Sequence, residues 1–417
     1  MPRLDAHRTW LLYCGALGLA TATGWTVAAV YFVRDVGMGP LELVLAGTAL
    51  EVAYFLFEVP TAVLADAYSR RASVVLAQVL MGAGFVLTGA FADVGVVLAA
   101  AALTGFGWTF RSGAEDAWLA DEVGPERMAR SFQRGAQAQR ALALVGIGLA
   151  VGLATIDLRV PLLVSGGLFL ALGLVLALVM PETGFRPAPR GELGRVRALA
   201  RTAADGGRLV RARPILLLIV GIAFFGGMWS EGVDRLWEAH LLLDVGVPGL
   251  GDLDPVLWFG VLNAAALLLA LAVAQPLVPR FERAGRRGMA RVLLLLDALL
   301  IATTLAFALA GSFALAVAAF LALDVTRSLS QPVWSAWLNA NVDDSRVRAT
   351  AISITNLGDS AGEWGGGPAL GAIGSAFGIR AALSVGALVL APALWLYGRA
   401  LRHHAREPLA PAAEQVL

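Results

Sequence analysis

Long apolar runs, separated by short charged or glycine- and proline-containing segments, make up most of the chain. Each run has about 20 residues or more, the length that an α-helix needs to cross the roughly 30 Å apolar layer of a bilayer. An isolated strand would leave backbone groups unsatisfied there, so the runs predict membrane-spanning helices. Twelve such runs occur, at 9–33, 41–64, 72–92, 94–119, 135–156, 160–180, 214–243, 255–279, 289–310, 312–338, 349–375 and 379–400.

A hydrophilic segment between the sixth and seventh runs divides the chain into two halves. It carries eight arginines and the proline-rich sequence FRPAPRGE, which is typical of a linker. We therefore predict an all-α integral membrane protein with a six-helix bundle over 1–181 and a second over 214–400. The linker covers 182–213, and a short tail covers 401–417.

Composition agrees with this interpretation and excludes a soluble globular protein. Hydrophobic residues make up 58% of the chain, and its mean hydropathy is +0.73, too apolar for a surface in water. The 32 basic residues are all arginine. In the predicted topology 26 of them lie on the side of the termini and the linker, three lie in the opposite loops, and three lie within helices. Because positively charged loops stay inside, we expect a multi-pass protein of the inner (plasma) membrane with both termini cytoplasmic.

Few residues of the chain are suited to catalysis or metal binding. Cys14 is the single cysteine, and the four histidines lie at predicted helix ends or in loops. No nucleophile and base stand together at membrane depth, and a chain without lysine lacks the lysine of a phosphate-binding loop. We expect no enzymatic activity, no cofactor, no metal and no nucleic-acid partner.

An internal repeat relates the two halves. The stretch FLFEVPTAVLADAYSRR (55–71) has a weaker copy, AQPLVPRFERAGRR (274–287). Parallel six-helix repeats are the architecture of transporters that work by alternating access, with the site between the halves near the midplane. At an offset of 216 residues the matched pairs are Pro60 with Pro276, Asp66 with Glu282, Arg70 with Arg286, and Arg71 with Arg287.

The first copy resembles the loop signature of the major facilitator superfamily, GxxxDRxGRR, and this resemblance covers nearly the full chain. Asp66, Arg70 and Arg71 match the signature. Ala62, Ala67 and Ser69 replace its other residues. The resemblance implies twelve helices in two bundles and a cytoplasmic gate that holds the inner face together in one conformer. The gate residues would be Asp66, Arg70, Arg71, Glu282, Arg286 and Arg287.

Two further signatures bear on the type of transporter. Proton-coupled drug exporters of this family carry an arginine a few residues before a GxG in the fourth helix. Here GFG is present at 105–107, but Ala101 occupies the arginine position. The glycine-rich signature of their fifth helix is echoed at Gly146–Gly152 and more closely at Gly367–Gly371.

Charged residues within the predicted helices are the main candidates for function, because a charge in hydrocarbon costs roughly 2.5–3.5 kcal/mol and must face the protein interior. Ten acids stand against three arginines, so some acids must be protonated or a cation must bind. The acids are Glu51, Glu58, Glu115, Asp116, Glu231, Asp234, Glu238, Asp324, Asp359 and Glu363, and the arginines are Arg111, Arg235 and Arg327.

Helical spacing assigns these residues to two sites. Ion pairs are predicted between Arg111 and Glu115, between Glu231 and Arg235, and between Asp324 and Arg327, since residues three or four apart are neighbours. The predicted substrate or proton cavity comprises Glu51, Glu58, Arg111, Glu115, Asp324, Arg327, Asp359 and Glu363. The outer part of the seventh helix is either an extracellular gate or a solvated mouth, formed by Glu231, Asp234, Arg235 and Glu238.

The resemblance and the surplus of acids together predict a secondary transporter. The favoured hypothesis is a monomeric multidrug-type antiporter that exports small amphiphilic or cationic compounds in exchange for protons. An importer of a small metabolite or organic ion, and a lipid flippase on the same scaffold, remain alternatives. The expected partners are membrane lipid, a small-molecule substrate and protons.

Overall fold

The computed structural model describes residues 4–186, 213–249, 255–342 and 345–406, and in these residues it contains helices and no β-strand. The first half begins with α1 (Ala6–Tyr31), whose last turn continues as the π-helical η1 (Phe32–Val36). Six more helices follow: α2 (Pro40–Ala67), α3 (Arg70–Ala90), α4 (Val94–Arg111), α5 (Ala114–Val123), α6 (Pro125–Ala154) and α7 (Arg159–Val179).

The second half has the same plan. It opens with α9 (Pro214–Ala239), which continues as the π-helical η2 (His240–Val245). The following helices are α10 (Leu257–Glu282), α11 (Gly285–Ala308), α12 (Phe313–Ala340), α13 (Ser345–Phe377), α14 (Ile379–Val389) and α15 (Ala391–Arg406). In the described residues, eleven helical segments are long and apolar enough to cross a membrane, and the 33-residue α13 is the twelfth long helix. The predicted all-helical membrane fold is confirmed.

Three helices depart from the predicted boundaries for local reasons. The fourth run breaks between α4 and α5 because Gly113 adopts a positive φ of 71°, a backbone conformation that favours glycine. The predicted helix at 135–156 begins ten residues earlier, at Pro125. Its first turns are polar, so an apolar run does not include them, while proline suits a first helical position. The last run divides at Leu390 into α14 and α15.

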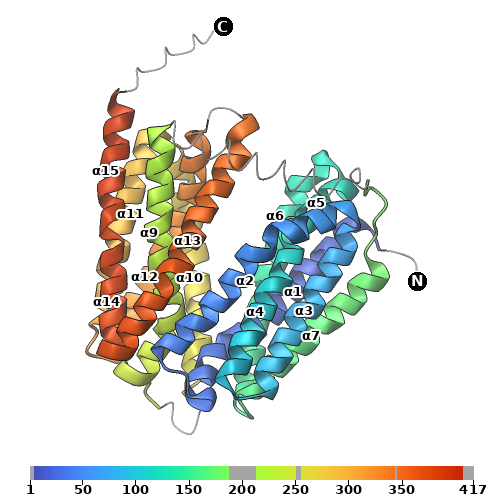
Figure 1. Cartoon of the computed structure of the whole chain (residues 1–417), viewed down its shortest axis with the longest axis horizontal. Helices are drawn as coiled ribbons and strands as arrows, with labels where there is room; N and C mark the ends of the chain where they lie inside the picture. Colours follow the sequence, from blue (N-terminus) through green and yellow to red (C-terminus); the bar gives the residue numbers. More distant parts are fainter. Residues whose placement is uncertain (1–3, 187–212, 250–254, 343–344, 407–417) are drawn as a thin grey trace.

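Figure 1 shows α1–α7 and α9–α15 as two groups of helices that lie together at one end and apart at the other. We call the end with the turn between α2 and α3, where α15 also ends, the terminal end, and the opposite end the far end. The backbone N–H of Leu4 donates to the carbonyl of Val179 at 3.1 Å, which places the start of α1 beside the end of α7 at the terminal end.

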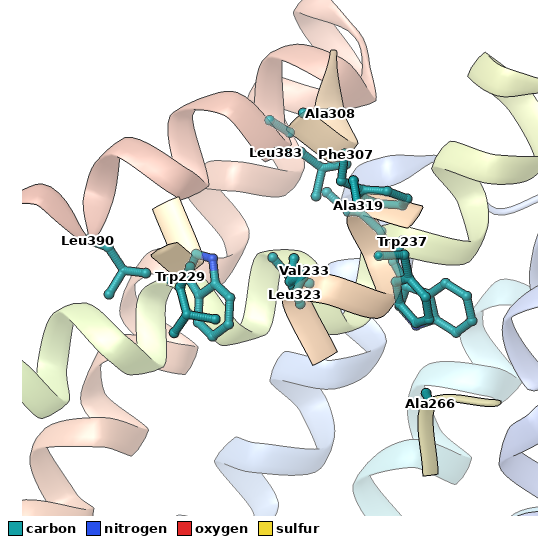
Figure 2. Packing of buried hydrophobic residues seen from close by; sticks show 14 of the residues in the cluster. Trp229, Val233, Trp237, Ala266, Phe307, Ala308, Ala319, Leu323, Leu383 and Leu390 are labelled. Carbon is teal, nitrogen blue, oxygen red and sulfur yellow. The ribbon is translucent and has the colours of Figure 1, made fainter. Parts of the chain in front are cut away.

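Large aromatic side chains fill the interior of the second half (Figure 2). Trp237 and Phe307 are among the residues labelled there. The rings of Trp237 and Phe320 stack with centroids 4.3 Å apart, and the ring centroids of Phe307 and Phe320 are 5.9 Å apart. Aromatic pairs of this kind add to the stabilisation from burial. They position α9, whose polar residues form part of the site described below.

The two halves contact each other along α2 and α13, which we call the α2–α13 seam. Near the far end, the backbone N–H of Leu41 donates to Oγ of Ser375 at 3.1 Å. A Cβ atom on Gly371 would lie 3.1 Å from Cα of Leu41, so glycine permits this close approach. At the other end of the seam the rings of Phe55 and Trp364 are 6.1 Å apart.

Candidate functional site

Two sizeable cavities lie within the described residues. The first, the interbundle cavity, has a volume of about 580 Å³ and is lined by α1 and α6 of the first half and by α9 and α10 of the second. Its polar wall contains Gln139, Arg140, Asp234, Glu238 and Asn263. Asp234 and Glu238, predicted as outer-gate residues, therefore line a cavity between the halves.

The second, the C-half cavity, has a volume of about 540 Å³ and lies among α9, α11, α12, α13 and α15. Three residues of the predicted substrate or proton cavity line it, namely Arg327, Asp359 and Glu363. Asp297, which the sequence analysis did not select, is also in its wall, and so is Tyr397. Both cavities are in the size range of small-molecule sites, about 300–1,000 Å³.

Arg327 pairs with a residue of another helix, which corrects the predicted pair with Asp324. Its guanidinium donates to both carboxylate oxygens of Asp234 on α9, and Nη2 and Oδ2 are 2.8 Å apart. The same guanidinium lies 5.5 Å from the ring centroid of Trp229. A planar guanidinium binds a carboxylate best through two parallel hydrogen bonds, a geometry that Asp234 provides from across the bundle.

Glu231 and Arg235 form the predicted pair within α9. Nε of Arg235 and Oε1 of Glu231 are 3.1 Å apart, and only 4% of the Glu231 side chain is exposed. The pair packs against α2 at Gly47, where a Cβ atom would lie 2.0 Å from Nε of Arg235. It also reaches α13, since a Cβ on Gly367 would lie 2.8 Å from Cγ of Glu231. The pair thus lies where α9 meets the α2–α13 seam.

Glu51 and Glu363 are half-buried and come from the two helices of the seam. Arg235 and Glu231 act electrostatically on Glu51. Glu51 and Asp359 in turn act electrostatically on Glu363. Carboxylates from both halves are therefore close enough to influence one another.

The other predicted cavity residues of the first half form a separate cluster that lines neither of these two cavities. Nε of Arg111 is 3.6 Å from Oε1 of Glu115, as predicted from their spacing. The hydroxyl of Tyr13 on α1 donates to the same carboxylate. On α2, the hydroxyl of Tyr54 donates to Glu58 at 2.9 Å. The hydroxyl of Tyr54 is also 3.1 Å from Oγ of Ser112, the residue that follows α4, so these contacts join α1, α2, α4 and α5 within the first half.

The predicted cytoplasmic gate of the first half is at the terminal end, where its contacts stay within that half. Arg70 lies 3.3 Å from Asp66 and also pairs with Asp121 of α5. Arg71 donates to the carbonyl of Ala177 at the end of α7. In the second half, Arg286 is half-buried and Arg287 exposed near the start of α11. The side chain of Glu282 lies outside the described residues.

Two buried polar residues were missed by the sequence analysis. Asp297 is 7% exposed in the middle of α11, where an isolated acid in an apolar run was the available signal. His240 is fully buried, not at a solvated helix end. Its Nδ1 is 2.9 Å from the Asp244 carboxylate and its Nε2 is 3.0 Å from the carbonyl of Phe307. No group of three or more His, Cys, Asp or Glu side chains suited to a metal is found in the described part of the chain.

Comparison with known proteins gives consistent matches. The family model of the Major Facilitator Superfamily matches residues 9–243. The chain is similar to the uncharacterized MFS-type transporter YxaM of Bacillus subtilis (strain 168), with 23% identity over 363 residues that cover 86% of each protein.

Solved structures with a similar fold include two transporters. A bacterial homologue of the human lysosomal transporter Spinster superposes with a TM-score of 0.75 at 16% identity, over 98% of each chain. A mutant of the nucleoside transporter NupG superposes with a TM-score of 0.78 at 11% identity, over 95% of this chain and 100% of the other. The family match extends over more than half of the chain, so the protein belongs to the major facilitator superfamily and is a membrane transporter, not an enzyme.

Proposed function

We propose that this transporter exports small amphiphilic or cationic compounds in exchange for protons and works by alternating access. The observation that carries the proposal is that Glu51 on α2 and Glu363 on α13 lie beside the seam contact of Phe55 and Trp364, whose ring centroids are 6.1 Å apart, so that each half contributes an acid there. Two carboxylates that repel each other oppose contact between the helices that carry them. Protonation or a bound cation removes this repulsion. Proton and substrate therefore each bias the contact between the halves.

The charge of the C-half cavity supports a cationic substrate. Its one arginine, Arg327, is held by Asp234. The cavity wall then retains the carboxyl groups of Asp297, Asp359 and Glu363. A net negative wall favours a cation over an anion. Because the same carboxyl groups can take up protons, substrate and proton compete for one set of sites, which is the chemistry that an exchanger requires.

The arrangement of contacts between the halves supports a conformer closed at the far end. The seam contacts of Leu41 and Ser375 lie there, whereas Arg70 and Arg71 bind partners in their own half at the terminal end. We take the terminal end to be cytoplasmic, because the turn with Arg70 and Arg71, the start of α1 and the end of α15 lie on that side, and positively charged loops stay inside. Opening at the terminal end would then admit substrate from the cytoplasm. The protein would act as a monomer in the inner (plasma) membrane.

The direction of transport and its coupling can be tested in liposomes that contain the purified protein. A pH gradient of either sign is imposed, and accumulation of ethidium and of neutral metabolites is followed. Proton-coupled export predicts that ethidium accumulates in vesicles that are acidic inside, because outward proton movement drives inward substrate movement. Accumulation in vesicles that are acidic outside would instead identify a proton-coupled importer. Equal flux with either gradient and with no gradient would contradict proton coupling.

A further inference from the structure

Asp297 lies on α11, a helix of the second half that does not take part in the α2–α13 seam. α11 packs against α12, α14 and α15. Asp297 is halfway along it, and its carboxylate is in the wall of the C-half cavity. Only 7% of the residue is exposed, so nine-tenths of it is covered while the remainder faces the cavity.

The carboxylate of Asp297 has no protein partner in the described part of the chain. It takes part in none of the hydrogen bonds or ion pairs found there, and the group on which its charge acts is the hydroxyl of Tyr397, another residue of the cavity wall. An ionised carboxylate in such a place is strongly unfavourable unless a cation accompanies it. The carboxylate of Asp297 is therefore a negative charge beside a cavity, where a cation bound in that cavity can neutralise it.

The remaining walls of the cavity suit an organic cation better than a hydrated metal ion. Trp229, Trp334 and Tyr397 contribute aromatic rings. Tyr397, which is 1% exposed, is held by a ring contact with Trp337 at 5.6 Å. Aromatic faces attract ammonium groups and accommodate their apolar substituents. A small divalent ion would need several oxygen ligands at close range, and Asp297 has no second acid beside it.

Arg327 does not neutralise Asp297, because both terminal nitrogens of the Arg327 guanidinium donate to the carboxylate of Asp234. Arg327 interacts electrostatically with Asp359, and Glu51 interacts electrostatically with Glu363. These acids are therefore coupled to the seam and to α9, whereas Asp297 is not. The cavity has one isolated carboxylate and, in addition, acids connected to the contact between the halves.

We propose that the C-half cavity is a binding site for an organic ammonium cation and that the positive group of this ligand lies against Asp297. All the residues that line this site belong to the second half. The inference deepens the proposed function by assigning its substrate class to one cavity, and it rests on that function only in treating the bound cation as substrate. Binding itself is measurable without transport.

Binding is tested with the purified full-length protein in detergent, by fluorescence anisotropy of ethidium. Asp297→Asn removes the charge at nearly constant shape and should weaken ethidium binding by about tenfold or more. Asp297→Glu keeps the charge and should bind within a few-fold of the original protein. Glu126→Gln makes the same charge change at an exposed residue at the start of α6 and should leave binding unchanged.

A second variant tests the cavity independently of Asp297. Gly226 lines the cavity, and a Cβ atom built on it meets nothing within 4 Å. Gly226→Leu should therefore fill the cavity and displace ethidium without altering any charge. Each variant is first checked for a single size-exclusion peak and an unchanged melting temperature, so that loss of binding is not loss of fold.

A pair of competitors tests the class of ligand. Benzyltrimethylammonium should displace ethidium, and neopentylbenzene, its neutral counterpart of the same shape, should not. Equal displacement by both compounds, or full ethidium affinity in both Asp297→Asn and Gly226→Leu, would overturn the inference. If the original protein binds ethidium as expected but its ethidium flux is the same with and without a pH gradient, proton coupling is overturned while this binding site stands.

Discussion

Arg327 on α12 binds both carboxylate oxygens of Asp234 on α9, with Nη2 and Oδ2 2.8 Å apart. The two residues are 93 positions apart in the chain. Their pair connects the interbundle cavity, which Asp234 lines, to the C-half cavity, which Arg327 lines. It also removes the positive charge that would otherwise oppose a cation in the C-half cavity.

Removing both members of this pair should cost less stability than the two single losses added together. Asp234→Asn leaves the guanidinium of Arg327 without its main partner, and we expect a loss of about 1 kcal/mol, since the side chains are 31% and 40% exposed and water screens part of the interaction. The double variant Asp234→Asn with Arg327→Gln should lose less than the sum of the two single variants. Thermal melts of the four purified proteins measure this coupling, and strictly additive losses would show that the pair contributes nothing.

The interactions that the sequence predicts are those within one helix. Glu231 with Arg235 and Arg111 with Glu115 follow from a spacing of four residues, and both pairs are present. Asp324 is also on the same helix as Arg327, but helical spacing cannot compare it with a partner on another helix. The bidentate geometry of Asp234 is decided by how α9 and α12 pack, which a single sequence does not reveal.

The helices themselves were predictable because the bilayer imposes their length and their apolar character. What the apolar pattern could not indicate were interruptions of other origin, such as the turn at Gly113, and polar helical extensions, such as the start of α6 at Pro125. The sequence analysis did not select Asp297 for a related reason. A single acid in an apolar helix has no partner in sequence, and its role depends on a cavity that three-dimensional packing creates.

A methyl group at Gly47 should disturb the far-end contact between the halves. In Gly47→Ala the new Cβ would lie 2.0 Å from Nε of Arg235 and 2.1 Å from Oε1 of Glu231, so the ion pair must move away from α2. We expect a loss of about 1–3 kcal/mol, typical of overpacking, and a lower transport rate. Melting temperature and flux in liposomes measure both effects.

Gly148 provides the matched control for this change. It lies inside α6, where a Cβ atom meets nothing within 4 Å. Gly148→Ala should therefore leave the melting temperature unchanged or raise it slightly, because alanine favours a helix by up to about 1 kcal/mol over glycine. Equal losses in both variants would mean that the effect comes from the helix backbone and not from the contact with Arg235.

Fixing the far end should stop transport reversibly. Leu41 and Ser375 are joined by a 3.1 Å hydrogen bond between N and Oγ, so cysteines at these positions lie close enough to be cross-linked. In a Cys14→Ser background, oxidation of Leu41→Cys with Ser375→Cys should abolish flux, and reduction should restore it. A protease site inserted within 187–212 reports the link, since cleaved halves stay joined until reduced. Full flux in the oxidised protein would exclude separation of this end during the cycle.

The acids of the seam should control the response to pH. Glutamine resembles a protonated glutamic acid, so in Glu51→Gln or Glu363→Gln the carboxylates of the two halves no longer repel each other at any pH. For the original protein we expect flux to change as falling pH protonates these acids and removes the repulsion. In either variant we expect flux driven by a pH gradient to fall about tenfold or more, while exchange of substrate for substrate continues.

Parallel measurements in liposomes of gradient-driven flux and of substrate exchange, over a series of pH values, separate these two activities. Glu126→Gln serves as the control, because it makes the same chemical change at an exposed position outside the seam. A variant that loses both activities together has lost substrate binding or fold, not coupling. A seam variant that keeps the pH response of the original protein would remove that acid from the coupling mechanism and leave the role to Asp297 and Asp359 of the C-half cavity.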